Sequence, residues 1–275
     1  MKPLIEMTRR NQSSPYFGSM VRFAQPLFDH FGINHFWYYR ILSDGTYAYV
    51  GTHEAWNEYC AHYGLIKYFP CVRHPDVLQP GITFMKTGLN AEAQEILNTI
   101  WEKFGIHFNL NIFERCSEGI SAFGFGTRFN NLEAEERLLN ELPLLRYFTK
   151  EFRKRHQKLI RSVEDNGVDL NPLMGRALYE PPKGGVTPCD RSGFLRELGC
   201  TAIFALSPRE KEVLAFLANG FPASYIKEKL HLGSVRTVES YISSIKNKLS
   251  CHSKVELIEK AKEIASTGFL EYTDA

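Results

Sequence analysis

The sequence predicts an α/β N-terminal domain, with a five-stranded antiparallel sheet flanked by helices, followed by an all-α C-terminal domain of four helices. Aromatic, β-favouring runs meet at an Asp-Gly turn near the N-terminus. Apolar residues recur at helical spacing in the last quarter of the 275 residues. A stretch rich in Gly and Pro lies between these two regions and interrupts both periodicities. The chain therefore divides into two domains and a connecting segment.

The first part of the N-terminal domain alternates helix and hairpin. Residues 22–31 are a predicted helix that ends at a glycine. The runs FWYYRIL (36–42) and TYAYVGT (46–52) are predicted strands, and Ser43-Asp44-Gly45 between them is a hairpin turn. Residues 53–63 follow as a helix. The first two strands are therefore expected to be adjacent and antiparallel.

The second part supplies three more strands. Residues 64–81 are predicted as a loop, and the run GITFMKT as a strand that precedes an amphipathic helix. Two alternating runs then form a second hairpin. One long helix or two close the domain, with Pro143 as the candidate position for a kink. This order suits a five-stranded antiparallel sheet with helices over its faces. The predicted strands are 81–87, 107–116 and 119–127, with a turn at 117–119. The predicted helices are 91–104 and 132–160, and the domain covers residues 1–164.

Residues 165–205 are predicted to be a linker. The stretches DNGVDLNP and EPPKGGVTPCDRSG concentrate Gly, Pro, Asp and Asn, which break periodic structure. A segment this long without clear structure is usually either functional or flexible. We expect a tether that lets the N-terminal domain reposition the C-terminal domain.

The C-terminal domain, residues 206–275, begins with helix-start chemistry. Ser207 is an N-cap, Pro208 occupies the first helical position, and Glu210 completes a reciprocal capping box. Asn219-Gly220 supplies the C-terminal cap of this helix. The other three predicted helices cover about 223–230, 235–249 after a cap at Ser234, and 254–265.

The third of these helices has two unlike faces. Val238, Ile242, Ile245 and Leu249 repeat at helical spacing, so one stripe is expected to be buried. Because the net charge is only +2, affinity for DNA must come from a local basic surface. The opposite face is polar and basic, as a helix in the major groove of double-stranded DNA requires. This face carries Arg236, Glu239, Ser240, Ser243, Lys246 and Lys248.

This segment resembles the C-terminal domain of LuxR-type transcription regulators. The resemblance rests on Leu206, Arg209, Glu210, Val213, Leu214, Gly220, Ile226, Leu230, Thr237, Val238, Ile245, Lys248 and Leu249. It implies that base and phosphate contacts fall on Arg236, Thr237, Glu239, Ser240, Ser243 and Lys246. Glu239 stands where the family commonly has Lys, and a carboxylate accepts from cytosine N4 but repels phosphate. The departure concerns the operator sequence and leaves the docking mode unchanged.

The N-terminal part is similar, by spacing, to the autoinducer-binding domain of quorum-sensing LuxR-type receptors. Trp56 matches the family's first ligand-contacting Trp, while Cys60, Phe69 and Phe84 stand where the family has Tyr, Asp and a second Trp. These three side chains do not replace the hydrogen bonds that hold an acyl-homoserine lactone. We therefore expect a small apolar ligand other than an ordinary acyl-homoserine lactone, with a hydroxyl offered by Tyr39 or Tyr59.

Other classes of function find no support in the sequence. There is no Gly-rich phosphate loop, zinc-protease signature or nucleophile elbow, so we expect neither an enzyme nor a cofactor or metal site. The six cysteines are scattered without a Cys-x-x-Cys pair, which fits reduced thiols in the cytoplasm. No signal peptide or run of eighteen apolar residues occurs, so we expect no membrane span.

Two hypotheses about the N-terminal domain remain open. In the first, an apolar molecule bound there changes the geometry of a homodimer and its affinity for DNA. In the second, the domain has a filled core and serves dimerisation or binding of a protein partner, independently of any ligand. A cavity among the sheet residues, or its absence, separates the two.

Overall fold

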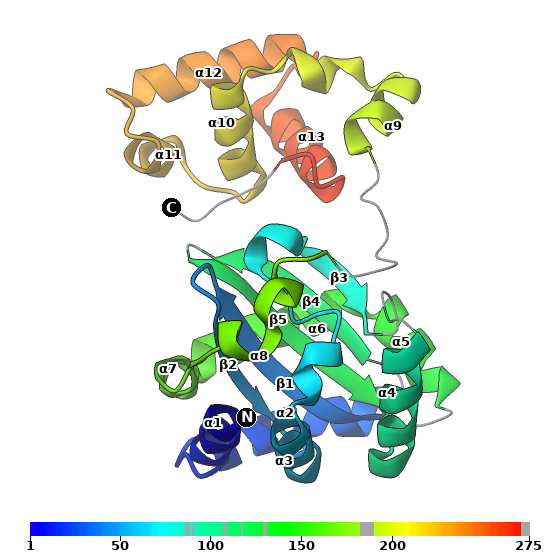
Figure 1. The fold of residues 1–275 in the computed structure, drawn as a ribbon. Helices are drawn as coiled ribbons and strands as arrows, with labels where there is room; N and C mark the ends of the chain where they lie inside the picture. Colours follow the sequence, from blue (N-terminus) through cyan, green and yellow to red (C-terminus); the bar gives the residue numbers. More distant parts are fainter. Residues whose placement is uncertain are drawn as a thin grey trace. The chain divides into compact units, whose positions relative to one another are not determined.

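The computed structural model describes residues 1–85, 89, 91–106, 109–116, 118–128, 131–181 and 190–270. The described chain forms two compact units, which we term the N-terminal unit (up to residue 181) and the C-terminal unit (from residue 190) (Figure 1). Every helix in this described part is too short or too polar to span a bilayer.

The N-terminal unit is built on one antiparallel sheet of six strands, in the order β3-β4-β5-β1-β2-β6. The expectation of five strands was therefore wrong. The extra strand is a two-residue edge strand that pairs with Thr46 and Tyr47 of β2, and so short a strand leaves no alternation in the sequence. The strands are β1 Ile33–Leu42, β2 Thr46–Gly51, β3 Gly81–Phe84, β4 Asn109–Cys116, β5 Gly119–Thr127 and β6 Val168–Asp169.

Both predicted hairpins occur. In the first, Ile41 pairs with Tyr47 across a turn in which Gly45 has φ +88°, a conformation that favours glycine. In the second, Cys116 pairs with Gly119. Ser117, which we placed in the second turn, lies outside the described residues, as do the last two residues of the predicted strand 81–87.

Helices cover both faces of the sheet (Figure 1). One apolar cluster lies between the sheet and α1, α3, α4, α8 and η3, and we term it the inner cluster because it surrounds the candidate ligand site. A second cluster, the outer cluster, lies between the opposite face and α2, α5, α6 and α7. The helices are α1 Lys2–Gln12, α2 Phe17–Phe31, α3 Glu54–Tyr63, α4 Ala91–Phe104, α5 Leu132–Asn140, α6 Leu142–Arg155, α7 Gln157–Asp165 and α8 Asn171–Met174, with short turns η1 Leu65–Tyr68, η2 Pro75–Val77 and η3 Gly175–Leu178.

Two helical regions differ from expectation. Helix α1 was not predicted, yet its Leu4 and Met7 are buried in the inner cluster. The long segment 132–160 consists of three helices, broken at Glu141 and at His156. Pro143 stands in the first turn of α6, where its missing N–H costs no helical hydrogen bond, so a new helix starts there instead of a kink.

Part of the segment expected as a linker belongs to the sheet domain. β6 extends the sheet, and α8 and η3 follow it directly. Leu170, Met174 and Leu178 are buried in the inner cluster. The described residues up to 181 are therefore packed against the N-terminal unit.

The C-terminal unit contains the four predicted helices with boundaries within two residues of expectation. The capping box of Ser207 and Glu210 is present, and Gly220 has φ +78° after the first of these helices. The unit is nevertheless larger than four helices, because Leu195 of α9 and Ile203 of η4 are buried in the same core. The elements are α9 Arg191–Glu197, η4 Thr201–Ala205, α10 Pro208–Ala218, α11 Ala223–Lys229, α12 Val235–Lys248 and α13 Lys254–Ser266.

Candidate functional site

Helix α12 is fixed to its unit through one face. Its first turn is capped by Ser234, whose hydroxyl accepts from the Thr237 N–H at 3.2 Å. Val238, Ile242 and Ile245 are buried in the core of the C-terminal unit, where α12 packs on α10 and α11. The orientation of the opposite face is therefore set by the packing of this stripe.

The opposite face of α12 presents the predicted DNA-contacting residues together. Arg236, Glu239, Ser240 and Ser243 are exposed, and Thr237 and Lys246 are half-buried. The hydroxyls of Ser240 and Ser243 donate to the carbonyls of Arg236 and Glu239, at 3.0 and 2.9 Å. Their oxygens keep free lone pairs, so both serines are arranged to accept from a base amino group without a rotation.

Lys248, at the end of α12, is engaged within the unit. Its Nζ lies 2.7 Å from Oε2 of Glu210, and the Ser244 hydroxyl donates to Oε1 of the same carboxylate at 2.7 Å. Burial alone would raise the pKa of Glu210, but hydrogen bonds from Lys248, Ser207 and Ser244 lower that pKa from 4.5 to about 2. Lys248 therefore fastens α12 to α10, and Glu210 compensates its charge.

Four of the predicted ligand-binding residues converge in the inner cluster. The Trp56 and Phe69 rings stack at a centroid distance of 6.1 Å and an interplanar angle of 8°. Cys60 is buried on the same helix as Trp56, and burial raises the pKa of its thiol. The Tyr39 hydroxyl donates to the backbone carbonyl of Cys71 at 2.8 Å, so this hydroxyl is already engaged.

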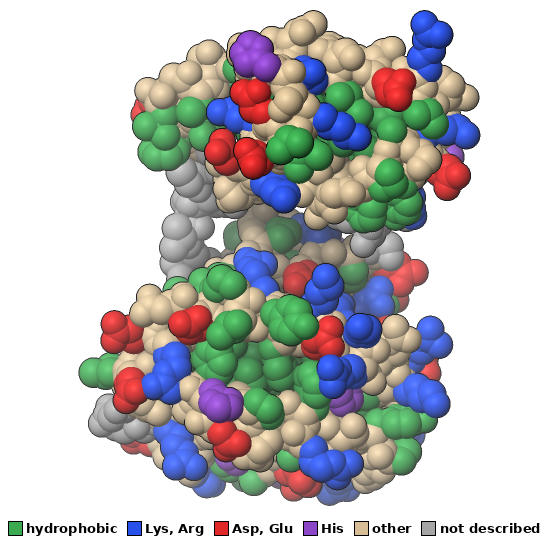
Figure 2. Space-filling view, turned by 180° about the vertical axis from the view of Figure 1, so that it is seen from behind, with side chains coloured by type: hydrophobic (Ala, Val, Ile, Leu, Met, Phe, Trp, Pro, Cys, Tyr) green, Lys and Arg blue, Asp and Glu red, His purple; other side chains and the backbone are tan. Residues whose placement is uncertain are grey.

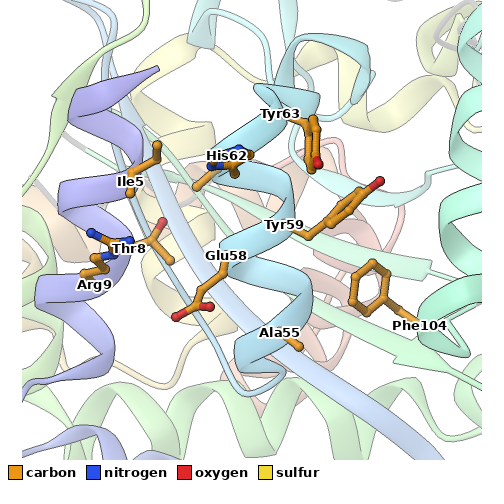
Figure 3. A pocket seen from close by; sticks show the side chains of 10 residues that line it. Ile5, Thr8, Arg9, Ala55, Glu58, Tyr59, His62, Tyr63 and Phe104 are labelled. Atoms are coloured by element: carbon orange, nitrogen blue, oxygen red, sulfur yellow. The ribbon is translucent and has the colours of Figure 1, made fainter.

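The other two predicted residues are not buried in the inner cluster, although Tyr59 packs against it. Phe84 packs against the outer cluster, because its cross-strand partner Leu110 faces that side of the sheet, and Met85 takes the inward position. Tyr59 lines a groove of about 390 Å³ along α1 and α3. Tyr59 lies there beside Tyr63 and Phe104 (Figure 3). Lys103 Nζ lies 4.4 Å from the centre of the Tyr59 ring.

A chain of buried and half-buried polar groups borders the inner cluster. The His53 N–H donates to Nδ1 of His35 at 3.2 Å, and the Tyr49 hydroxyl lies 3.3 Å from Nε2. This hydroxyl donates to Oδ1 of Asn57 at 2.7 Å, and the Asn57 amide donates to the Gly51 carbonyl at 2.6 Å. Burial lowers the pKa of His35 well below its ordinary value. His35 is therefore a neutral imidazole with the proton on Nε2.

Two small cavities flank the stacked rings of Trp56 and Phe69. Their volumes are about 20 Å³ and about 30 Å³, each enough for a water molecule, which needs roughly 10–15 Å³. The sheet-side cavity includes His35, Trp37, Met85 and Asn109 in its lining, and the helix-side cavity includes Leu4, Met7, Cys60 and Ile66.

Most of the lining residues, among them His35, Met85 and Asn109, were not among the sequence candidates. The alternation of β1 contains a signal for the first, because His35 shares a face with Trp37 and Tyr39. Asn109 carries no comparable signal, since a single polar residue in a strand predicts a solvent-facing position as readily as an interior one.

Comparisons with known proteins agree with the C-terminal geometry. Residues 205–261 match the family described as bacterial regulatory proteins, luxR family. No significant match to a curated protein was found. Similar solved structures include Escherichia coli SdiA, with 18% identity over 97% of both chains and a TM-score of 0.35. Another is SdiA in complex with octanoyl-rac-glycerol, with 17% identity over 97% of this chain and 95% of that chain and a TM-score of 0.35.

Proposed function

Because residues 205–261 form a domain of the luxR family of bacterial regulatory proteins, we propose that the chain is a transcription regulator that binds double-stranded DNA in a sequence-dependent way. The single observation that carries this proposal is the polar outer face of α12, held outward by its buried stripe. Arg236 and Lys246 are assigned to phosphates, and Glu239, Ser240 and Ser243 to base edges. Because its partner is DNA, we place the protein in the cytoplasm.

The test is a binding series with duplexes selected from a random pool. Arg236→Ala and Lys246→Ala should each weaken binding to every duplex and reduce the salt slope by about one, because each removes one phosphate contact. Ser240→Ala and Ser243→Ala should instead change the selected sequence. Lys260→Ala is the matched control, since Lys260 lies on α13 and pairs with Glu263 at 3.7 Å. Parental affinity and salt slope in both cationic variants would exclude α12 from the groove.

We propose that the regulator acts as a homodimer. One helix-turn-helix contacts few base pairs, so specificity normally requires two half-sites about one helical turn apart. On α13, Val255 is 67% exposed. On α5 and α6, Leu138 and Leu145 are buried in the outer cluster, so their face is not available to a partner.

Besides Val255 on α13, the N-terminal unit has exposed apolar side chains. Figure 2 shows hydrophobic side chains gathered on this unit among basic ones. The exposed apolar side chains of α5 and α6 are Leu132, Leu139, Leu144 and Tyr147. Sedimentation should give a dimer on a duplex with two half-sites; monomers alone, free and bound, would contradict the proposal.

We further propose that the inner cluster is where a small apolar ligand binds and changes DNA affinity. Support comes from the convergence of Trp56, Phe69 and Cys60 around two cavities bordered by aimed polar groups. Because each cavity holds little more than a water, entry of a ligand must displace the Phe69 ring or a neighbour. A filled interior also suits a ligand-independent regulator, which is the second candidate.

Thermal denaturation with added compounds separates the two candidates. A ligand that binds the folded state raises Tm by mass action. Ordinary acyl-homoserine lactones should leave Tm unchanged, since Phe69 supplies no acceptor for the amide N–H of the headgroup. An apolar molecule extracted with the native protein should raise Tm. If no extracted molecule or apolar probe does so, the ligand-independent candidate stands.

A further inference from the structure

We infer that Asn109 is the polar anchor of the inner cluster, and that the ligand is an uncharged, slender amphiphile with a hydrogen-bond donor at one end. The donor is a hydroxyl. The inference rests on the proposed ligand-sensing function and names the chemistry that the same interior accepts.

The amide oxygen of Asn109 is a buried hydrogen-bond acceptor that no donor among the described residues satisfies. Asn109 is 3% exposed and lines the sheet-side cavity. Its Oδ1 has no hydrogen-bond partner in the part of the chain that the structure describes, and its Nδ2 makes only a long contact of 3.7 Å to the Met85 sulfur. A buried acceptor left unpaired is costly, so a donor that enters the cavity is favoured over an apolar group of the same size.

The backbone register holds this acceptor in place. Asn109 on β4 pairs with Gly126 on β5. A Cβ atom at position 126 would lie 2.8 Å from Oδ1 of Asn109 and 3.3 Å from the Trp37 ring. Glycine therefore leaves the space that the amide oxygen occupies, and the acceptor is positioned by two neighbouring strands.

Other polar groups around the cavities are already engaged or neutral. The Tyr39 hydroxyl donates to the Cys71 carbonyl, and the Tyr49 hydroxyl donates to Asn57. His35 is neutral, and the described residues that line the two cavities include no Asp, Glu, Lys or Arg. A charged ligand would therefore be buried without a counter-ion, which excludes carboxylates and amines as the favoured class.

The two cavities give the ligand a direction. Tyr47, Tyr49, Trp56 and Phe69 line both of them, so these rings form the partition. The sheet side ends at Asn109, whereas the helix side includes mainly apolar side chains such as Leu4 and those of α3 and η1. Displacement of the Phe69 ring joins the two, so the donor end reaches Asn109 and the hydrocarbon body extends toward α1.

The test uses a pair of isomers that differ only in the donor. Binding of hexanol and of methyl pentyl ether to the full chain is measured by calorimetry and thermal denaturation. The parent protein should bind hexanol about tenfold more tightly, because only the alcohol satisfies Oδ1. Octanol should bind more tightly still, by about fourfold for each added methylene that is buried.

Variants then locate the preference. Asn109→Leu and Asn109→Val, two replacements without an acceptor, should bring the ratio of the two affinities close to one. Asn111→Leu is the matched control: Asn111 is the next residue on the same face of β4, its Oδ1 accepts from Trp37 at 3.2 Å, and it does not line either cavity. This control should keep the parent's preference.

The outcomes separate this inference from the proposed function. Equal affinity for the two isomers in the parent overturns the anchor even if every variant unfolds, and leaves ligand sensing standing. A preference that survives in Asn109→Leu or Asn109→Val has the same meaning. Failure of every probe to bind overturns the inference that the ligand is an amphiphile. Duplex binding by the same samples decides independently whether the chain is a DNA-binding regulator.

Discussion

The candidate functional polar residues lie on the surface of the C-terminal unit but in the interior of the N-terminal unit. In the C-terminal unit the apolar stripe of α12 is buried, and Arg236 and Ser240 face outward. In the N-terminal unit His35, Tyr49 and Asn109 are enclosed between a sheet and its helices. Function at the first site therefore depends on a surface, whereas function at the second depends on an interior that also stabilises the fold.

This difference decides how changes in each unit are interpreted. The outer residues of α12 contribute little to the core, so their replacement changes DNA binding with small effects on stability. Interior groups of the N-terminal unit have partners far away in the chain: Trp37 donates to Asn111, 74 residues away, and Tyr38 to Glu164, 126 residues away. A change there therefore affects stability, whether or not it also alters ligand binding.

The largest expected effect breaks the N-terminal unit alone. A Cβ atom at Gly124, on the central strand β5, would overlap the Trp37 ring, and neither a strand nor a buried indole can yield cheaply. Gly124→Ala should reduce the free energy of unfolding of this unit by about 3 kcal/mol or more. Gly233→Ala is the control in the other unit, because a Cβ there meets nothing within 4 Å. Differential scanning calorimetry checks both, and an unchanged N-terminal transition in Gly124→Ala would contradict the packing around Trp37.

The next effect tests the partition between the two cavities. Phe69→Ala removes the ring that stacks on Trp56 and should lower the stability of the N-terminal unit by about 3 kcal/mol. The enlarged cavity should also admit benzene, as apolar cavities of comparable origin do. A rise in Tm with benzene in the variant, absent in the parent, is the expected result; no rise would mean that the surroundings collapse into the space.

A smaller effect concerns the fastening of α12. Glu210→Gln should lower the stability of the C-terminal unit by about 1–2 kcal/mol, since it weakens the capping box and the pair with Lys248. The parent's contribution from this carboxylate is complete above pH 4.5 and is lost as pH falls toward 2, because folding lowers the pKa of Glu210 to about 2. Between these pH limits, the Tm of the C-terminal unit should depend less steeply on pH in Glu210→Gln than in the parent. Equal slopes would assign the acid sensitivity to other groups.

The smallest effect is stabilising. His231 follows α11 with φ +50°, a left-handed conformation that a non-glycine residue adopts at a cost. His231→Gly should raise the free energy of unfolding of the C-terminal unit by about 0.5–1 kcal/mol. Chemical denaturation of the parent and the variant measures this difference, and a loss of stability would show that the imidazole makes a compensating contact.

The sequence predicted what depends on neighbours in the chain. The caps at Ser207 and Ser234 and the stripe of α12 follow from spacing within one or two turns. Helix α1 was missed because no side chain caps its start, and it is held by distant contacts, such as that of the Asn11 amide, which donates to the Tyr49 carbonyl 38 residues away. Phe84 was placed inside by spacing alone, while its pairing with Leu110 turns it to the other face. Asn109 shows its role only when two strands and a helix converge.

All three tryptophans of the sequence, Trp37, Trp56 and Trp101, lie in the inner cluster. Tryptophan emission therefore reports on the N-terminal unit alone, and DNA that docks on α12 has no indole nearby in its own unit to perturb. A compound that displaces Phe69 acts directly on Trp56 and should alter this emission. A change in emission on addition of duplex DNA, with no compound present, would be an optical measure of signal passing from one unit to the other.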